Sequence, residues 1–208
     1  MAVKNHALDE QIITAARSEF LTCGFEKASL RKIAANADVT VGAIYTRWPT
    51  KDRLFCALVE PLVARIGAVF SSLLAEYSPE APQYTPEHMA HSMHMESQYI
   101  LDLLFEDYDR AVLLLCRSTG SSLESFFDQV VERKIRETLV FFEHTGSPHP
   151  SPAVLKLLIT AQFQMYAQIL SEGCGIDEAR ETLNAAMVYH TGGWMALLSR
   201  KEYMGGQQ

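Results

Sequence analysis

Several features that would assign this chain to a familiar class are scarce or missing. Its four cysteines, at positions 23, 56, 116 and 174, form no CxxC pair, which argues against a disulfide framework and a zinc ribbon. No glycine-rich phosphate loop, GxSxG or HExxH motif occurs, so no enzyme and no cofactor is expected. The first ten residues turn polar at once, and Glu60, Pro61 and Arg65 interrupt the longest apolar run, so no membrane span or leader is expected. A reducing cytoplasm fits these absences best.

Basic residues are also few, but they are concentrated in one place. The net charge is −7, with 18 basic and 25 acidic residues. Residues 27–53 nevertheless hold six basic residues and two acids, a local charge of +4 on an otherwise acidic chain. A positive region of this kind attracts phosphate even when the whole molecule is an anion. The alternative is an ordinary solvated helix face, which charge alone does not distinguish.

Helical periodicity dominates the sequence, and alternating strand patterns are rare. The pattern predicts a long helix before Gly24, short helices over 30–36 and 41–47, and a longer helix after Thr50. Further helices are expected near 86–105, 109–117, 123–144, 152–171 and 177–200, the last capped by Asp177. The predicted fold class is therefore all-α: an N-terminal three-helix head at 1–53 and a C-terminal helical bundle at 54–208.

The two short helices fit the pattern of a helix-turn-helix DNA reader. Such a unit needs a bracing helix, a sharp turn and a second helix with small residues near the groove. Ala34 and Ala37 allow the two helices to approach each other, and Val39 and Ile44 can point inward. Hydroxyl and cationic side chains then remain for phosphates and base edges. The residues expected at the DNA are Ser29, Arg31, Thr40, Val41, Gly42, Ala43, Tyr45, Thr46, Arg47 and Lys51.

Residues 8–60 resemble the DNA-binding domain of the tetracycline-repressor (TetR/AcrR) family. The matching positions are Ile12 or Ile13, Ala15, Ala16, Phe20, Gly24, Phe25, Ser29, Ile33, Ala34, Ala37, Val39, Thr40, Gly42, Ile44, Tyr45, Trp48, Lys51 and Leu54. Asp38 stands where the family usually has glycine, and aspartate tolerates the left-handed conformation of such a turn. The resemblance implies a ligand-responsive transcription regulator, most often a repressor, that binds double-stranded operator DNA as a homodimer.

The last two predicted helices are apolar on more than one face. In the final one, Leu183, Met187, His190, Trp194 and Leu197 share a side. A helix that is apolar on two faces must be buried twice, once in its own core and once elsewhere. We expect a two-fold four-helix interface between two copies of the chain. A core that is entirely intramolecular is the alternative.

The segment 88–97, HMAHSMHMES, places three histidines and three methionines on one predicted helix. Imidazole and thioether groups suit copper, zinc or nickel, whereas a partly exposed helix that uses methionine as filler is the simpler interpretation. A third interpretation is an effector pocket for a hydrophobic or aromatic molecule. Its candidate residues are His91, Met95, Tyr99, Phe105, Tyr166 and Trp194. The alternative function is therefore a helical protein that binds a small molecule or metal without binding DNA.

Overall fold

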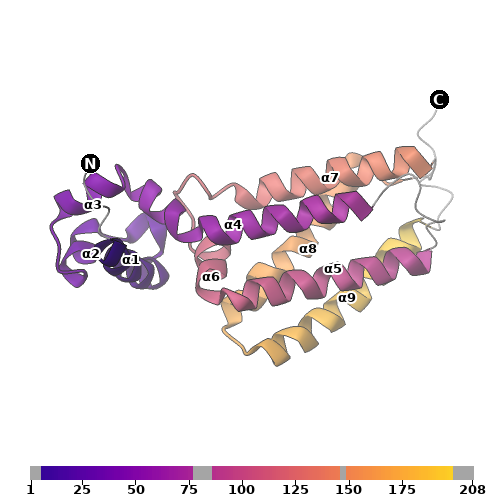
Figure 1. The fold of residues 1–208 in the computed structure, drawn as a ribbon. Helices are drawn as coiled ribbons and strands as arrows, with labels where there is room; N and C mark the ends of the chain where they lie inside the picture. The colour runs from indigo at the N-terminus through magenta and orange to yellow at the C-terminus, as the bar shows by residue number, and fades with distance from the viewer. Residues whose placement is uncertain (1–5, 77–85, 146–148, 199–208) are drawn as a thin grey trace. The chain divides into compact units, whose positions relative to one another are not determined.

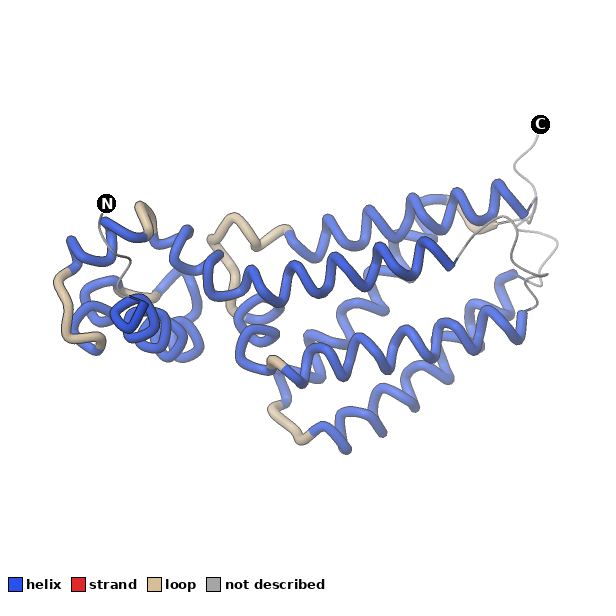
Figure 2. Tube along the Cα trace, in the orientation of Figure 1, coloured by secondary structure: helices blue, strands red, loops and turns tan. Residues whose placement is uncertain are grey.

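The structure, a computed structural model, describes residues 6–76, 86–145 and 149–198, and within these ranges α-helices are joined by turns and loops. Figures 1 and 2 show the helices and the loops between them. The helices within these ranges are α1 (His6–Lys27), α2 (Leu30–Asn36), α3 (Val41–Arg47), α4 (Lys51–Glu76), α5 (Pro86–Glu106), α6 (Tyr108–Cys116), α7 (Phe126–Thr145), α8 (Pro152–Glu172) and α9 (Ile176–Leu198). The predicted all-α class is confirmed, and most predicted helices agree with the observed bounds to within a few residues.

Hydroxyl side chains cap the beginnings of several helices. Thr40 precedes α3, and its Oγ1 accepts a hydrogen bond from the Ala43 amide at 3.1 Å. Thr50 precedes α4 and accepts the Arg53 amide at 3.0 Å. Ser151 caps α8 in the same way. Each cap satisfies an amide group that the first helical turn leaves without a partner.

Backbone in the left-handed region marks two helix ends. Gly24 interrupts α1 with a φ of 72°, and Gly173 ends α8 with a φ of 70°. Glycine adopts this conformation without a steric penalty, which is why both positions suit it. The expected cap at Asp177 is wrong. α9 begins one residue earlier, at Ile176, so Asp177 lies in the first turn, where the helix dipole favours its negative charge.

The chain divides by its internal contacts into two compact units. The first comprises residues 1–65 and 107–125, and the second comprises residues 66–106 and 126–208. The first unit thus contains α6 and the beginning of α4 in addition to α1, α2 and α3. The sequence-based division between residues 53 and 54 concerns function rather than contacts, and it stays a prediction.

An aromatic cluster forms the core of the first unit. Phe20, Phe25 and Phe55 come from α1, the turn after Gly24 and α4, and their ring centroids lie 5.1 to 6.0 Å apart. Ile12 and Ile33 are fully buried beside them. Aromatic and aliphatic burial of this kind supplies most of the stabilisation of a small helical head. It also fixes the surface on which α2 and α3 are placed.

Polar contacts join α6 and the residues after it to the rest of the first unit. Arg110 donates from Nε to the Leu58 carbonyl at 2.6 Å and pairs with Asp107 at 2.6 Å. The Phe25 amide donates to the Arg117 carbonyl at 2.9 Å. These bonds explain why α6, which the sequence separates from the head by some forty residues of α4 and α5, belongs to the same unit.

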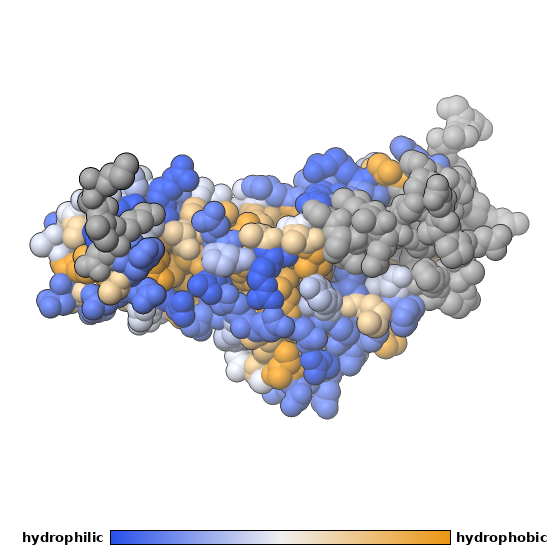
Figure 3. All heavy atoms as spheres, viewed as in Figure 1, coloured by the Kyte–Doolittle hydropathy of each residue, from blue (hydrophilic) through white to orange (hydrophobic). Residues whose placement is uncertain are grey.

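The second unit is built from the pairs α5 with α9, α7 with α8, and α8 with α9. Apolar residues from all four helices fill its core. Fully or almost fully buried examples are Leu101, Leu104, Val131, Leu155, Ile159, Tyr166, Leu183 and Met187. Apolar residues also reach the surface of the molecule, as the orange regions of Figure 3 show. Leu157 of α8 and Val188 and Tyr189 of α9 are the most exposed large ones in the described residues, at 69%, 76% and 85%.

By length and composition, α8 could cross a membrane. The expectation that no apolar run reaches this length is therefore wrong for α8. A core helix meets the same criterion, and one side of α8, including Leu155, Ile159 and Phe163, is buried in the second unit. Burial in the core thus explains the apolar residues on the inner side of α8. It does not explain the apolar residues on the outer side.

Candidate nucleic-acid interface

A tight turn sets the angle between α2 and α3. Asp38 adopts a φ of 50°, the left-handed conformation expected for it, and is the position at which the family pattern usually has glycine. The Val39 amide donates to the Ala34 carbonyl at 2.9 Å and closes the end of α2. Ala34 and Ala37 are buried, so small side chains allow the close packing that the sequence predicted. The helix-turn-helix geometry is therefore formed by the residues expected to form it.

The short helix α3 turns one side inward and the other outward. Ile44 is fully buried, whereas Tyr45 is 48% exposed and Thr46 and Gly42 are also exposed. A Cβ built on Gly42 would meet only Thr40 Oγ1, at an ordinary 3.7 Å, so the head itself does not require glycine there. The absence of a side chain leaves room for another molecule to approach the backbone.

Some polar side chains of α3 face outward, and others form bonds within the first unit. Thr46 uses its hydroxyl to donate to the Gly42 carbonyl at 2.9 Å, which leaves its oxygen lone pairs facing solvent. Val41 and Ala43 are partly buried. The outward side of α3 thus presents a phenol, a threonine and a bare glycine backbone, a combination suited to groups in a groove.

Arg47 has different partners from those that the sequence suggested. Its guanidinium forms an ion pair with Asp9 of α1, and its Nη1 also donates to the Ala43 carbonyl at 3.1 Å. The two charged side chains are 24% and 25% exposed. The side chain therefore folds back along α3 towards α1. A DNA contact from Arg47 stays a prediction, and in this conformation the charge is already partnered.

Lys51 is also engaged within the head. Its ammonium donates to the carbonyl oxygens of Phe25, Glu26 and Ala28 at 2.8, 3.0 and 3.3 Å. The same nitrogen lies 4.6 Å from the centre of the Phe25 ring, within range of a cation–π interaction. An ammonium group has three protons, and all three have acceptors here. In this conformation Lys51 closes the end of α1, and a DNA contact from Lys51 stays a prediction.

The remaining cations and the cap of α2 lie at the surface. Arg31 and Lys32 of α2 are exposed. Ser29 precedes α2, and its amide donates to the buried carboxylate of Glu19 at 3.1 Å, while its hydroxyl makes no capping bond. Lys32 was not among the predicted DNA contacts, although its position inside the basic segment 27–53 is a signal that could have identified it.

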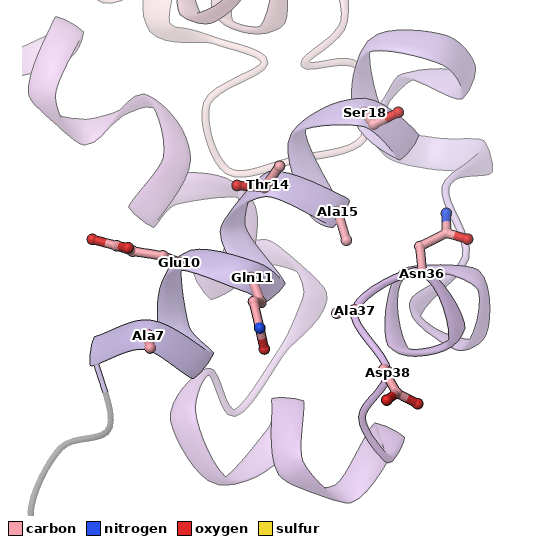
Figure 4. Close-up of a pocket in the computed structure, with 9 residues that line it drawn as sticks. All are labelled: Ala7, Glu10, Gln11, Thr14, Ala15, Ser18, Asn36, Ala37 and Asp38. Carbon is pink, nitrogen blue, oxygen red and sulfur yellow. The ribbon is translucent and has the colours of Figure 1, made fainter.

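A hollow on the first unit lies between α1 and the end of α2 (Figure 4). Gln11, Thr14, Ser18 and Asn36 line it together with the carboxylates of Glu10 and Asp38. Figure 4 shows Glu10 extending away from the turn that holds Asp38. Two carboxylates and no cation make this hollow a poor site for phosphate. The outward side of α3 is the better candidate for the interface.

The six predicted effector residues do not share one environment. His91, Met95 and Tyr99 lie on the exposed side of α5, with Met95 and Tyr99 at 54% and 58% exposure. Tyr166 and Trp194 are buried in α8 and α9. Phe105 is partly buried near the end of α5. The structure therefore separates the first three from the buried pair, and a common pocket of all six stays a prediction.

The core of the second unit holds, besides the predicted Tyr166, a polar pair that sequence reasoning missed. Glu96 of α5 is 7% exposed and accepts two hydrogen bonds from the Lys134 ammonium of α7, at 2.7 and 2.8 Å. Tyr166 is 2% exposed, and its hydroxyl has no hydrogen-bond partner. Burial, reinforced by the negative charge of Glu96, raises the pKa of Tyr166 well above its usual value, so the phenol keeps its proton. A glutamate at a core position of a predicted helix was the available signal.

A second buried polar pair lies on α9. The Trp194 indole donates to His190 Nε2 at 2.9 Å. This bond requires an unprotonated Nε2, and burial lowers the pKa of His190, which favours that form. In the described part of the chain, no three His, Cys, Asp or Glu side chains are arranged to hold a metal ion. The side chain of His88 lies outside the described residues.

Comparisons with known proteins agree with this geometry. A sequence model of the bacterial regulatory proteins of the tetR family matches residues 12–58. Among curated proteins, none matches the chain. Many solved structures do match. A TetR-like transcriptional regulator from Rhodococcus sp. RHA1 is 16% identical, with a TM-score of 0.60 over 95% of this chain and 100% of its own.

Two further structures give the same result. NalD, the secondary repressor of the MexAB-OprM multidrug efflux pump in Pseudomonas aeruginosa, is 18% identical, with a TM-score of 0.55 over 90% of this chain and 97% of its own. A transcriptional regulator of the TerR/AcrR family from Aquifex aeolicus VF5 is 16% identical, with a TM-score of 0.57 over 88% and 98%. At these identities the likeness establishes the fold over nearly the whole chain. It confirms the predicted head and C-terminal helical domain.

Proposed function

We propose that this chain, a transcriptional regulator of the tetR family of bacterial regulatory proteins, is a homodimeric repressor that a small molecule releases from its operator. The observation that carries this proposal is the outward side of α3. It presents Gly42, Tyr45 and Thr46 on a helix whose inner residue, Ile44, is fully buried. A helix-turn-helix protein reads base edges with a rigidly held second helix of this kind.

The contacts to DNA would come from two kinds of group. Tyr45, Thr46 and the backbone at Gly42 would meet base edges or the sugar–phosphate backbone in the major groove, with Val41 and Ala43 at their flanks. Ser29, Arg31 and Thr40 would contact phosphates beside the groove, and exposed Lys32 would add another cation. These residues supply binding energy through phosphate neutralisation and specificity through α3.

The second copy would be bound through α8 and α9. The outward side of α9 carries Ala185, Val188, Tyr189 and Gly192, all exposed and uncharged. Leu157 and Ala161 give the outer side of α8 the same character. Exposed apolar surface of this extent is typical of a protein interface, and a two-fold axis would bury each helix against its counterpart. This arrangement also explains the membrane-like composition of α8 without a bilayer, in keeping with a cytoplasmic protein.

The effector would be recognised in the core of the second unit. The unpartnered hydroxyl of Tyr166 and the buried Glu96–Lys134 pair are polar groups surrounded by apolar side chains. The pair is neutral overall, so these groups favour a neutral, largely apolar molecule with one hydrogen-bonding group. Binding to one arrangement of the dimer would lower the affinity for DNA by the difference between the effector's affinities for the two arrangements. No catalytic role is proposed for any residue.

The test is selection of binding sites from a randomised DNA duplex library by the purified full-length protein. Enrichment of a two-fold symmetric sequence, bound more weakly as salt is raised, is the expected result. A helical protein that binds only a small molecule or a metal would enrich no sequence. That outcome would replace the proposed function with the alternative.

A further inference from the structure

The recognition helix α3 is too short to hold its own orientation. It has seven residues, and an isolated helix of this length is unstable in water. Its inner side is fixed by Ile44, and α2 packs against both α1 and α3. An ion pair between Asp9 and Arg47 joins α1 to the C-terminal end of α3. That ion pair fixes the position of the C-terminal end of α3, the end that carries Tyr45 and Thr46.

We infer that Asp9 is a positioning residue that fixes α3 and withholds the charge of Arg47 from DNA, an inference that rests on the proposed DNA binding. Two contacts and partial burial hold the arginine in place. Its Nε lies on Asp9 Oδ1, its Nη1 donates to the Ala43 carbonyl at 3.1 Å, and both charged groups are about three-quarters buried. Asp9 itself lies in the first turn of α1, where the helix dipole stabilises a carboxylate.

The arrangement has a consequence for how DNA is bound. A guanidinium on the recognition helix would ordinarily bind any phosphate within reach and strengthen binding to every sequence. Paired with Asp9, it adds no such contact, so the affinity of α3 depends more on Tyr45 and Thr46. The ion pair thus favours discrimination over affinity. Asp9 therefore contributes to specificity as a positioning residue, although it lies on a different helix from the residues that read DNA.

The inference predicts different effects of the two substitutions on the salt dependence of binding. In Arg47→Gln, the slope of log affinity against log salt on a random-sequence duplex should equal that of the wild type, because no phosphate contact is lost. In Asp9→Ala, the freed guanidinium should gain a phosphate contact and steepen the slope by about 0.9. The ratio of selected-operator to random-duplex affinity should fall roughly tenfold in both variants.

Glu10→Ala is the matched control. Glu10 is the adjacent residue of α1, is exposed, and loses the same negative charge without freeing an arginine. For this variant, the slope of log affinity against log salt and the ratio of operator to random-duplex affinity should stay close to the wild-type values. If Asp9→Ala does not give a folded protein by circular dichroism, Asp9→Asn removes the charge while keeping the size of the side chain, and it should change the slope in the same direction.

Two results would overturn the inference while leaving the proposed function intact. One is a slope that becomes shallower by about 0.9 in Arg47→Gln, which would make Arg47 a phosphate contact in the complex. The other is an equal slope for Asp9→Ala and Glu10→Ala. If the wild-type protein forms no complex with any duplex, the proposed function fails, and this inference fails with it.

Discussion

Single cations in the head illustrate how the same residue type serves different purposes. The basic segment 27–53 suggested a set of phosphate contacts, but the structure uses two of its cations internally. Lys51 closes the C-terminal end of α1, and Arg47 pairs with Asp9. Arg31 and Lys32 remain exposed. Local charge identified the region correctly, but it could not assign a role to each cation, because that depends on which carbonyl or carboxylate lies within reach.

We predict that Lys51→Met destabilises the head. The change keeps most of the aliphatic stem but leaves the carbonyls of Phe25, Glu26 and Ala28 without their shared donor. Loss of hydrogen bonds from a charged group should lower the free energy of unfolding by about 2–3 kcal/mol, measured by urea denaturation. Arg53→Ala, an exposed cation two residues later, should lower it by less than about 0.5 kcal/mol. Equal effects of the two changes would contradict the capping role.

The buried phenol of Tyr166 leads to a prediction of unchanged or increased stability, in contrast to the loss predicted for Lys51→Met. Its hydroxyl has no partner and is desolvated, which costs about 1–3 kcal/mol. Tyr166→Phe should therefore leave the midpoint of thermal unfolding unchanged or raise it, while weakening release from the operator by the effector. Tyr99→Phe, at a tyrosine that is 58% exposed on α5 and lies outside the proposed effector core and the proposed dimer surface, is the control and should change neither. A clear drop in the unfolding midpoint of Tyr166→Phe would show that the hydroxyl already has a stabilising partner.

Local sequence signals predicted where the helices begin and end better than they predicted which helices pack together. The predicted beginnings of the helices after Thr40, Thr50 and Ser151 were correct, since a hydroxyl cap depends on groups within four residues, whereas the hydroxyl of Ser29 makes no capping bond before α2. Asp177 was misplaced by one residue because the chain enters α9 from Gly175. The inclusion of α6 in the first unit was not predictable, because it depends on distant contacts such as Arg110 with the Leu58 carbonyl.

We predict that His190 of α9 makes the thermal stability of the protein depend on pH. Burial lowers the pKa of His190 from its ordinary value of 6.5, so the folded protein binds this proton less readily than the unfolded chain. Stability from this residue is therefore fully present above pH 6.5 and is lost as the pH falls from 6.5 through the lowered folded-state pKa. Thermal unfolding should shift to lower temperature over that range, and His190→Gln should reduce the shift.

Trp194→Phe is the control for this effect. It removes the indole donor but leaves His190 buried, and burial is the cause of the lowered pKa. Most of the acid-dependent shift should therefore persist in this variant. Disappearance of the shift in Trp194→Phe, together with its persistence in His190→Gln, would assign the effect to another group.

At the scale of the whole molecule, the apolar outer sides of α8 and α9 form the surface at which a second copy is proposed to bind. The sequence indicated this surface because both helices are apolar on more than one side, and the structure shows which residues stay exposed. The sequence could not divide the predicted effector residues between a buried core and the outer side of α5. That division depends on the rotation of each helix, which a shift of one residue changes by about 100°.

We predict that a charge on this surface abolishes the dimer. Tyr189→Glu and Val188→Asp place carboxylates at positions that are 85% and 76% exposed in the single chain. The single chain should therefore stay folded, while the mass measured by light scattering falls from a dimer to a monomer and operator binding weakens at least tenfold. Arg136→Glu, an exposed charge change on α7, should leave the mass unchanged. A dimeric Tyr189→Glu variant would place the interface elsewhere.

The most direct test of the central claim, that the outward side of α3 reads DNA, is site-specific photo-cross-linking. A benzoylphenylalanine in place of Tyr45, which is 48% exposed on α3, should form an adduct with the selected operator. The same group in place of Ser18, in the acidic hollow of α1, should form none. Adducts from position 18 and none from position 45, with both proteins bound to DNA, would contradict the account.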